Sequence, residues 1–285
     1  MNFKGAACAI GAGLSFSVAS SLAKLSYFAG SNPWTIVTVR SLVPVVILAL
    51  WLWISRRALL PPSPERLRAV IVGVLVLIQS LAHYSAFRYI HLGLAILVFF
   101  LFTIFTLFAN AIIERRRPTG RELSATGLAF VGLAIALAPA RDDGIALGVG
   151  LALLAAVTFT ALIILSSRWF KSSDARPRTL VILATVGLPL AFAGQAGDLF
   201  AVPTTPAGLW ALAGVPIFYF AGFLLLMHAA RVIGPVLATM LLNIEPVATM
   251  LLASVVEAKP LVALQWFGGA LVFTALFVAT VRRRS

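Results

Sequence analysis

The stretch AFRYIHLGLAILVFFLFTIFTLFANAIIERRRP, residues 86–118, has a counterpart in AARVIGPVLATMLLNIEPVATMLLASVVEAKP, residues 229–260. The positions that match at a constant offset of 143 are Ala86 and Ala229, Arg88 and Arg231, Ile90 and Ile233, Ala95 and Ala238, and Glu114 and Glu257. Phe16 meets Phe159 at the same offset, and after a shift of one residue Pro118 meets Pro260. Apolar runs match by chance, but Arg, Glu and Pro at fixed offsets do not. The pattern therefore indicates an internal duplication.

The composition places this duplication in a membrane. Of the 285 residues, 61% are hydrophobic and 11% are charged, with a mean hydropathy of +1.04, whereas soluble domains carry about 25% charged residues. A helix spans a bilayer core with about 20 apolar residues. The stretches that meet this requirement are 5–28, 33–55, 69–88, 92–113, 122–140, 145–169, 179–197, 206–230, 234–256 and 261–281. The sequence thus predicts an all-α integral membrane protein with ten transmembrane helices.

The basic residues predict the orientation. With ten spans and a cytoplasmic N-terminus, 17 of the 22 Lys and Arg residues fall on the cytoplasmic side, as the positive-inside rule requires. We therefore expect both termini in the cytoplasm and a multi-pass protein of the cell's inner (plasma) membrane. The net charge of +13 is attributed to runs of basic residues that anchor the topology and favour anionic lipid headgroups. The lipid bilayer is the expected partner, and nucleic acid is not.

Each half contains five predicted spans, an odd number, so the second half enters the membrane inverted. The expected architecture is two inverted five-helix repeats, in domains 1–141 and 142–285. Inverted repeats are typical of alternating-access transporters, whose site lies near the midplane between the halves. Inverted repeats also occur in channels, so a passive channel or uniporter stays open as an alternative.

The twice-repeated pattern A-x-R-x-I-x4-A, followed by an apolar helix, a terminal Glu, a Pro and a Gly-rich helix, resembles the EamA-type domain of the drug/metabolite transporter superfamily. The likeness covers nearly the whole chain as two domains. N-I-E-P-V-A at 243–248 resembles the family's L-E-P-V stretch, and Phe102 and Thr103 replace its Glu and Pro in the first half. Lys24, Pro33 and Arg40 also fit the family pattern.

The resemblance implies a carrier that exports small metabolites, often amino acids. Its cavity would be formed mainly by helices 1, 3, 4, 6, 8 and 9. Within the superfamily, the chain also resembles the YddG-type amino-acid exporters.

Polar residues at membrane depth are the first candidates for substrate contact, because an ionised acid at a helix centre costs about 2.5–3.5 kcal/mol. Glu245, with Asn243 beside it, either binds an ammonium group or a coupling proton, or holds helices together. Pro246 removes a backbone donor and predicts a kink there. Gln79 and His83 share one helical face, next to Tyr84, and either face a cavity or bond between helices.

Two basic residues and several aromatic residues complete the candidate set. Lys24 and Arg40 either extend to the outer interface or contact a substrate carboxylate. Phe100, Tyr219 and Phe223 either line a cavity for an apolar or aromatic group or pack against neighbours. The predicted substrate-binding set is therefore Gln79, His83, Tyr84, Phe100, Tyr219, Phe223, Asn243 and Glu245, with Lys24 and Arg40 as possible carboxylate contacts.

No P-loop, HExxH or GxSxG motif and no Cys/His metal set occurs in the sequence. We therefore expect no cofactor, no metal and no enzyme, although an integral-membrane enzyme remains the less favoured alternative. The single cysteine, Cys8, excludes an intrachain disulfide. The prediction is a secondary-type transporter that exports small metabolites, with amino acids as the leading class, by alternating access. A monomer is compatible with this architecture.

Overall fold

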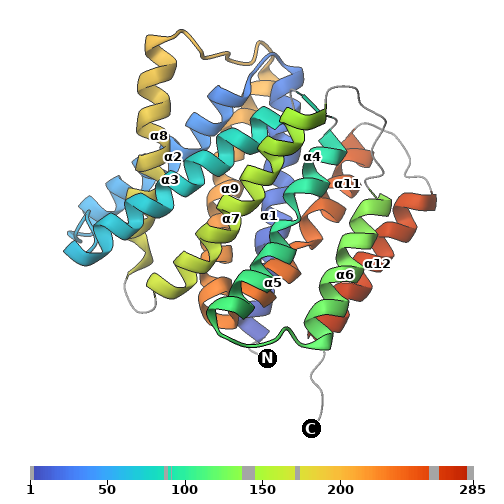
Figure 1. Ribbon diagram of the computed structural model, residues 1–285. Helices are drawn as coiled ribbons and strands as arrows, with labels where there is room; N and C mark the ends of the chain where they lie inside the picture. The colour runs from blue at the N-terminus through green and yellow to red at the C-terminus, as the bar shows by residue number, and fades with distance from the viewer. Residues whose placement is uncertain are drawn as a thin grey trace.

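The computed structural model describes residues 3–86, 89–90, 92–136, 145–170, 174–256 and 263–280. Within these residues the chain forms α-helices and no strand (Figure 1). The helices are α1 (Phe3–Phe28), α2 (Pro33–Ile54), α3 (Ser63–Ala86), α4 (Leu92–Phe99), α5 (Phe102–Ile113), α6 (Gly120–Ala136), α7 (Ile145–Trp169), α8 (Ala175–Ala196), α9 (Pro206–Ile233), α10 (Pro235–Leu242), α11 (Ile244–Val256) and α12 (Ala263–Thr280).

The helix boundaries repeat at the offset seen in the sequence. Adding 143 to the bounds of α4 gives the bounds of α10, and the same shift takes α6 onto α12 to within one residue. Equivalent helices run in opposite directions: α1 rises from the end that carries the N-terminus, whereas α7 descends toward it (Figure 1). The duplication is therefore visible in the backbone. Arg88, Glu257, Pro260 and the expected domain boundary at 141/142 lie outside the described residues.

Length and hydropathy mark eight of the described helical segments as able to cross a membrane. The described part of α6 has 17 residues, and the apolar segment of α12 covers Trp266–Val278. The spans expected at 122–140 and 261–281 are therefore represented by shorter described helices. The chain is a multi-pass helical membrane protein.

Two spans that were expected to be continuous are each divided into two helices. The break between α4 and α5 lies at Phe100 and Leu101, and the break between α10 and α11 lies at Asn243. At the first break, Leu101 N donates to Val98 O at 3.2 Å and Thr103 N donates to Phe100 O at 3.1 Å, the short i→i+3 bonds of a tightened turn. The sequence predicted a disturbance only in the second of these spans, at Pro246. The break in the first span was not predicted.

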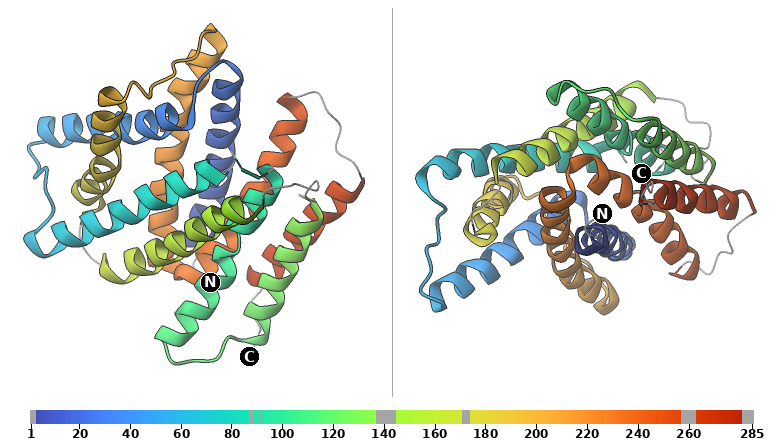
Figure 2. Two further views of the ribbon diagram at one scale, coloured as in Figure 1. Left: turned by 45° about the horizontal axis from the view of Figure 1, so that its top comes forward. Right: turned by 90° about the horizontal axis from the view of Figure 1, so that it is seen from below.

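The packing follows the same duplication. Helix α1 packs along α9 and α3 packs along α7. These two contacts are equivalent, because the offset of 143 relates α1 to α7 and α3 to α9. The same offset relates α2 to α8 and α6 to α12, and each of these helices packs against its own equivalent. Both views in Figure 2 place the α6–α12 pair at one side of the bundle. The remaining helices surround the centre, where the main buried cluster lies.

At the end of the bundle opposite the N-terminus, called the upper end here, the two halves are joined by hydrogen bonds. Asn32 Nδ2 donates to Leu199 O, Ala201 N donates to Thr35 Oγ1, and Thr204 N donates to Ala29 O, each at 2.8 Å. The turn between α1 and α2 is thus fastened to the connection between α8 and α9. These hydrogen bonds join the two halves at the upper end.

Candidate functional site

A cavity of about 80 Å³ lies at the centre of the bundle between the two halves. Its walls come from α1, α2, α3, α4, α7, α9, α10 and α11. A water molecule needs roughly 10–15 Å³ of such space, whereas ligand sites measure about 300–1,000 Å³. In this conformation the cavity therefore has room for a few waters and must widen to admit a solute of metabolite size.

Arg40 of α2 is the cation of this cavity. The residue is 6% exposed, and its Nη2 donates to Ser80 Oγ at 2.5 Å while its Nη1 donates to Tyr84 Oη at 3.2 Å. The guanidinium carbon lies 4.1 Å from the ring centroid of Tyr219 and 5.1 Å from that of Tyr84. Its Nε is buried without a hydrogen-bond partner among the described residues. Arg40 is thus held by hydroxyls and aromatic faces.

Glu245 of α11 lines the same cavity. It lies in the first turn of α11, two residues after the break at Asn243. In the described part of the chain its carboxylate forms no hydrogen bond or ion pair, and only its backbone oxygen is engaged, by Thr249 Oγ1 at 2.9 Å. The cavity therefore contains one basic and one acidic side chain that are not paired with each other.

The polar face of α3 forms a third part of the wall. Gln79, His83 and Tyr84 all line the cavity. Ser80 Oγ donates to Gln79 Oε1 at 3.4 Å, and the His83 ring lies 4.3 Å from the ring of Phe99 between centroids. This face presents neutral donors and acceptors beside Arg40.

Aromatic rings fill the position in the first half that corresponds to Glu245. Phe102, the residue at the equivalent position, is 0% exposed. Its ring lies 4.6 Å from Phe159, 5.1 Å from Phe99 and 5.0 Å from Phe100 between centroids. The duplicated scaffold therefore carries an acidic residue at this position in the second half and an apolar aromatic cluster in the first.

The other predicted site residues have different positions. Tyr219 and Phe223 line the cavity, whereas Phe100, Asn243 and Lys24 do not. Phe100 is 3% exposed within the aromatic cluster. Asn243 caps the break: its Nδ2 donates to Met240 O at 2.9 Å, and Thr103 Oγ1 donates to its Oδ1 at 3.5 Å. Lys24 lies 5.7 Å from the ring centroid of Phe28 on its own helix.

Sequence reasoning did not select Ser80, Phe16 and Phe159, although each lines the cavity or holds a side chain that does. Phe16 and Phe159 could have been found, because they match at the offset of 143. Ser80 could not have been found, because its role depends on the Arg40 side chain, which reaches it from another helix.

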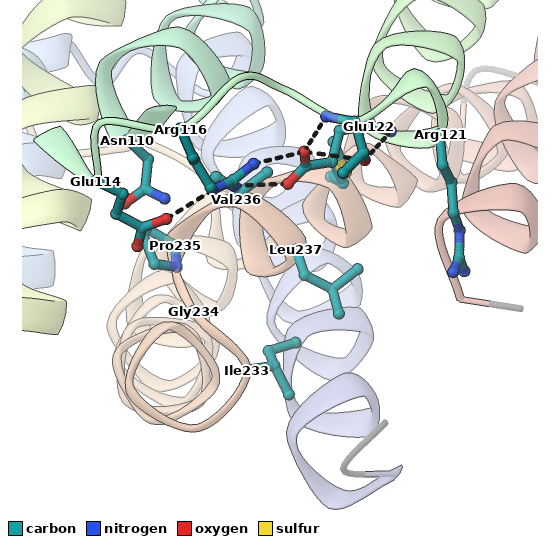
Figure 3. Close-up of a pocket in the computed structure, with 12 residues that line it drawn as sticks. Asn110, Glu114, Arg116, Arg121, Glu122, Ile233, Gly234, Pro235, Val236 and Leu237 are labelled. Carbon is teal, nitrogen blue, oxygen red and sulfur yellow. Dashed lines mark hydrogen bonds and ion pairs between the residues drawn. The ribbon is translucent and has the colours of Figure 1, made fainter. Parts of the chain in front are cut away.

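A second pocket, of about 340 Å³, lies at the lower end of the bundle near the connection between α5 and α6 (Figure 3). Arg116 Nη2 and Nη1 donate to Glu122 Oε1 at 2.7 Å and Oε2 at 2.8 Å, and its Nε donates to Glu114 Oε2 at 2.8 Å. The hydrogen bond from Arg116 lowers the pKa of Glu114. Because Arg116 already pairs with Glu114 and Glu122, we treat this pocket as a structural cluster and the central cavity as the candidate site.

The fold is that of a multi-pass helical membrane protein with a central cavity between its two halves. The model of the EamA-like transporter family matches residues 3–138 and again residues 146–281. The chain therefore belongs to the EamA-like transporter family, which is part of the drug/metabolite transporter superfamily. The resemblance inferred from the repeated motifs is confirmed.

Comparison with known proteins adds support for the fold alone. A solved chain described as "Crystal structure of protein" has a TM-score of 0.77 and 17% sequence identity, covering 97% of this chain and 97% of its own. No curated protein matches the chain. The likeness between structures thus extends over the whole bundle.

Proposed function

We propose that this chain is a secondary transporter that exports amino acids by alternating access through the central cavity. The observation that carries the proposal is the presence of Arg40 and Glu245 in the wall of one cavity without a mutual ion pair. A zwitterionic α-amino acid carries the two complementary charges. Its carboxylate would accept hydrogen bonds from the Arg40 guanidinium, which suits that geometry, and its ammonium group would face Glu245.

The rest of the lining suits the remaining parts of such a solute. Gln79 and His83 offer neutral hydrogen-bonding groups, and Phe16, Phe159 and Phe223 offer apolar surface for a side chain. Binding sites for small molecules commonly combine apolar walls with a few placed polar groups. Among the sequence-predicted residues, the substrate-binding set in this proposal is Gln79, His83, Tyr84, Tyr219, Phe223, Glu245 and Arg40.

The transport mechanism follows from the duplicated architecture. We assign ten membrane crossings in two inverted halves, 1–141 and 142–285. The protein would lie in the inner (plasma) membrane, with both termini in the cytoplasm. Rearrangement of one half against the other would open the cavity to each side in turn. The small volume of the cavity favours this cycle over a channel, because a channel conducts through a path that stays open.

The test is exchange of a labelled amino-acid panel in proteoliposomes, with and without a pH gradient, beside protein-free liposomes. The expected result is saturable exchange of at least one amino acid. Passage of water or ions at channel rates without amino-acid exchange would favour the channel alternative. Conversion of a lipid or metabolite into a new chemical species would favour the enzyme alternative. Either outcome contradicts the proposal.

A further inference from the structure

The surroundings of Arg40 are uncharged. Within the described residues no carboxylate contacts this guanidinium, and its hydrogen-bond acceptors are the hydroxyls of Ser80 and Tyr84. A buried arginine in a membrane helix ordinarily pairs with an acid or a backbone carbonyl. Here the acceptors satisfy donors of Arg40 without cancelling its charge.

The geometry leaves hydrogen-bonding capacity on the guanidinium. A guanidinium has five N–H donors, and the described contacts use one at Nη1 and one at Nη2, while Nε has no partner. The ring of Tyr219 lies 4.1 Å from the guanidinium carbon and the ring of Tyr84 lies 5.1 Å from it. Aromatic rings at these distances stabilise the cation and limit its tilt.

The Ser80 hydroxyl acts on Arg40 as an acceptor. A guanidinium carries N–H donors and no acceptor, so Ser80 Oγ accepts from Arg40 Nη2 at 2.5 Å whichever way its own proton turns. Gln79 Oε1 lies 3.4 Å from Ser80 Oγ and can accept that proton, and Ser80 is 0% exposed.

We propose that Ser80, Tyr84 and Tyr219 form a neutral cage that positions Arg40 and reserves its charge for a carboxylate of the transported solute. Ser80 is a positioning residue that acts only through Arg40, and Tyr84, which also lines the cavity, positions Arg40 through its hydroxyl. This inference rests on the proposed function, because it assigns the specificity for a carboxylate to residues that hold the binding group.

The test compares Ser80→Ala and Tyr84→Phe with wild-type protein in proteoliposome exchange. Each variant removes one acceptor from Arg40 and keeps nearly the same volume. We expect KM for a transported amino acid to rise about fivefold in each variant, since a lost hydrogen bond to a charged group weakens binding, while kcat stays within about twofold. The conservative variant Ser80→Thr keeps the hydroxyl and should restore the wild-type KM.

The matched control is Ser41→Ala. Ser41 follows Arg40 in α2 and is 1% exposed, but its Oγ donates to Val37 O of its own helix at 2.8 Å. Its substitution should leave KM within about twofold. A second readout is competition by the decarboxylated amine of the same amino acid: the preference for the amino acid over the amine should shrink in Ser80→Ala and Tyr84→Phe.

The possible outcomes separate the two proposals. If wild-type protein exchanges no amino acid, the proposed function fails. If wild-type protein exchanges amino acids but Ser80→Ala and Tyr84→Phe keep its KM and its preference over the amine, the cage alone is refuted. A fall in kcat at unchanged KM, as expected of a contact that only supports the fold, would also overturn the cage.

Discussion

At the scale of single residues, the charges of the central cavity are its most informative feature. The sequence indicated Glu245 and left Arg40 open between an interfacial and a binding position. The structure places both in one wall, and it buries Arg40 to 6% exposure. Sequence could reveal Glu245 because an acid in an apolar run is conspicuous. It could not rank Arg40, because the acceptors of Arg40 come from α3.

The first prediction concerns Glu245→Gln. The substitution replaces the carboxyl group that would face the substrate ammonium with an amide of the same shape, so amino-acid exchange should lose affinity by about tenfold, as expected for a lost charge-assisted contact. Inhibition by the deaminated carboxylic acid, which has no ammonium group, should change by less than about twofold. The measurement is competition against labelled amino acid in proteoliposomes.

Glu114→Gln is the control for this prediction. Glu114 bonds Arg116 at 2.8 Å at the lower end, outside the central cavity, and its substitution should leave the affinity unchanged. If Glu245→Gln exchanges amino acids with wild-type affinity and the same dependence on pH, Glu245 has no part in binding.

At the scale of elements, the broken helices show what local sequence signals can and cannot predict. Pro246 correctly indicated a disturbance in the span 234–256, because proline lacks a backbone donor. The span 92–113 contains no proline, yet it divides at the equivalent place. There the fold of the repeat, and not the local residue type, determines the backbone, and comparison of the two halves would have been the useful signal.

The second prediction concerns the contact between α6 and α12. A methyl group at Gly132 would lie 2.8 Å from Gly268 O and 2.9 Å from Leu271 Cβ, so Gly132→Ala must push the helices apart. We expect a loss of about 1–3 kcal/mol of stability, typical of overpacking, seen as a lower unfolding temperature in detergent.

Gly127→Ala is the matched control on the same helix. A methyl group at Gly127 meets no atom within 4 Å, and alanine is favoured over glycine in a helix by about 0.5–1 kcal/mol. The Gly127 variant should therefore be as stable as wild-type protein or slightly more stable. Equal unfolding temperatures for the two variants would contradict the close helix contact.

At the scale of the whole molecule, the duplication was the most reliable sequence signal. The match of residues at a fixed offset predicted two halves, and the helix bounds and the two family matches agree with it. The joining of the halves at the upper end could not be predicted, because the side chains of Asn32 and Thr35 bond to backbone groups of a connection that is distant in the sequence.

The third prediction is that the upper end must open during transport. Thr204 N and Thr204 Oγ1 both donate to Ala29 O, at 2.8 and 3.2 Å, so these positions meet across the two halves and are the pair chosen for a cysteine cross-link. In the double variant Ala29→Cys, Thr204→Cys, oxidation should abolish amino-acid exchange and a reductant should restore it. The measurement is exchange in proteoliposomes before and after reduction.

The single variants Ala29→Cys and Thr204→Cys control for oxidation itself, and the natural Cys8 is common to all of them. They should keep their activity under oxidant. Full exchange by the double variant, with the disulfide shown by mass spectrometry, would mean that these two connections need not separate during transport, and it would contradict the prediction.

The central claim is that the cavity transports amino acids through Arg40. Its most direct test is exchange of a labelled amino acid in proteoliposomes by wild-type protein and by Arg40→Gln, both shown to be folded. The account predicts saturable exchange by wild-type protein and a loss of at least about tenfold in kcat/KM for the variant, as expected when a charged hydrogen-bond donor to a carboxylate is removed. Equal exchange by the two proteins would contradict the claim.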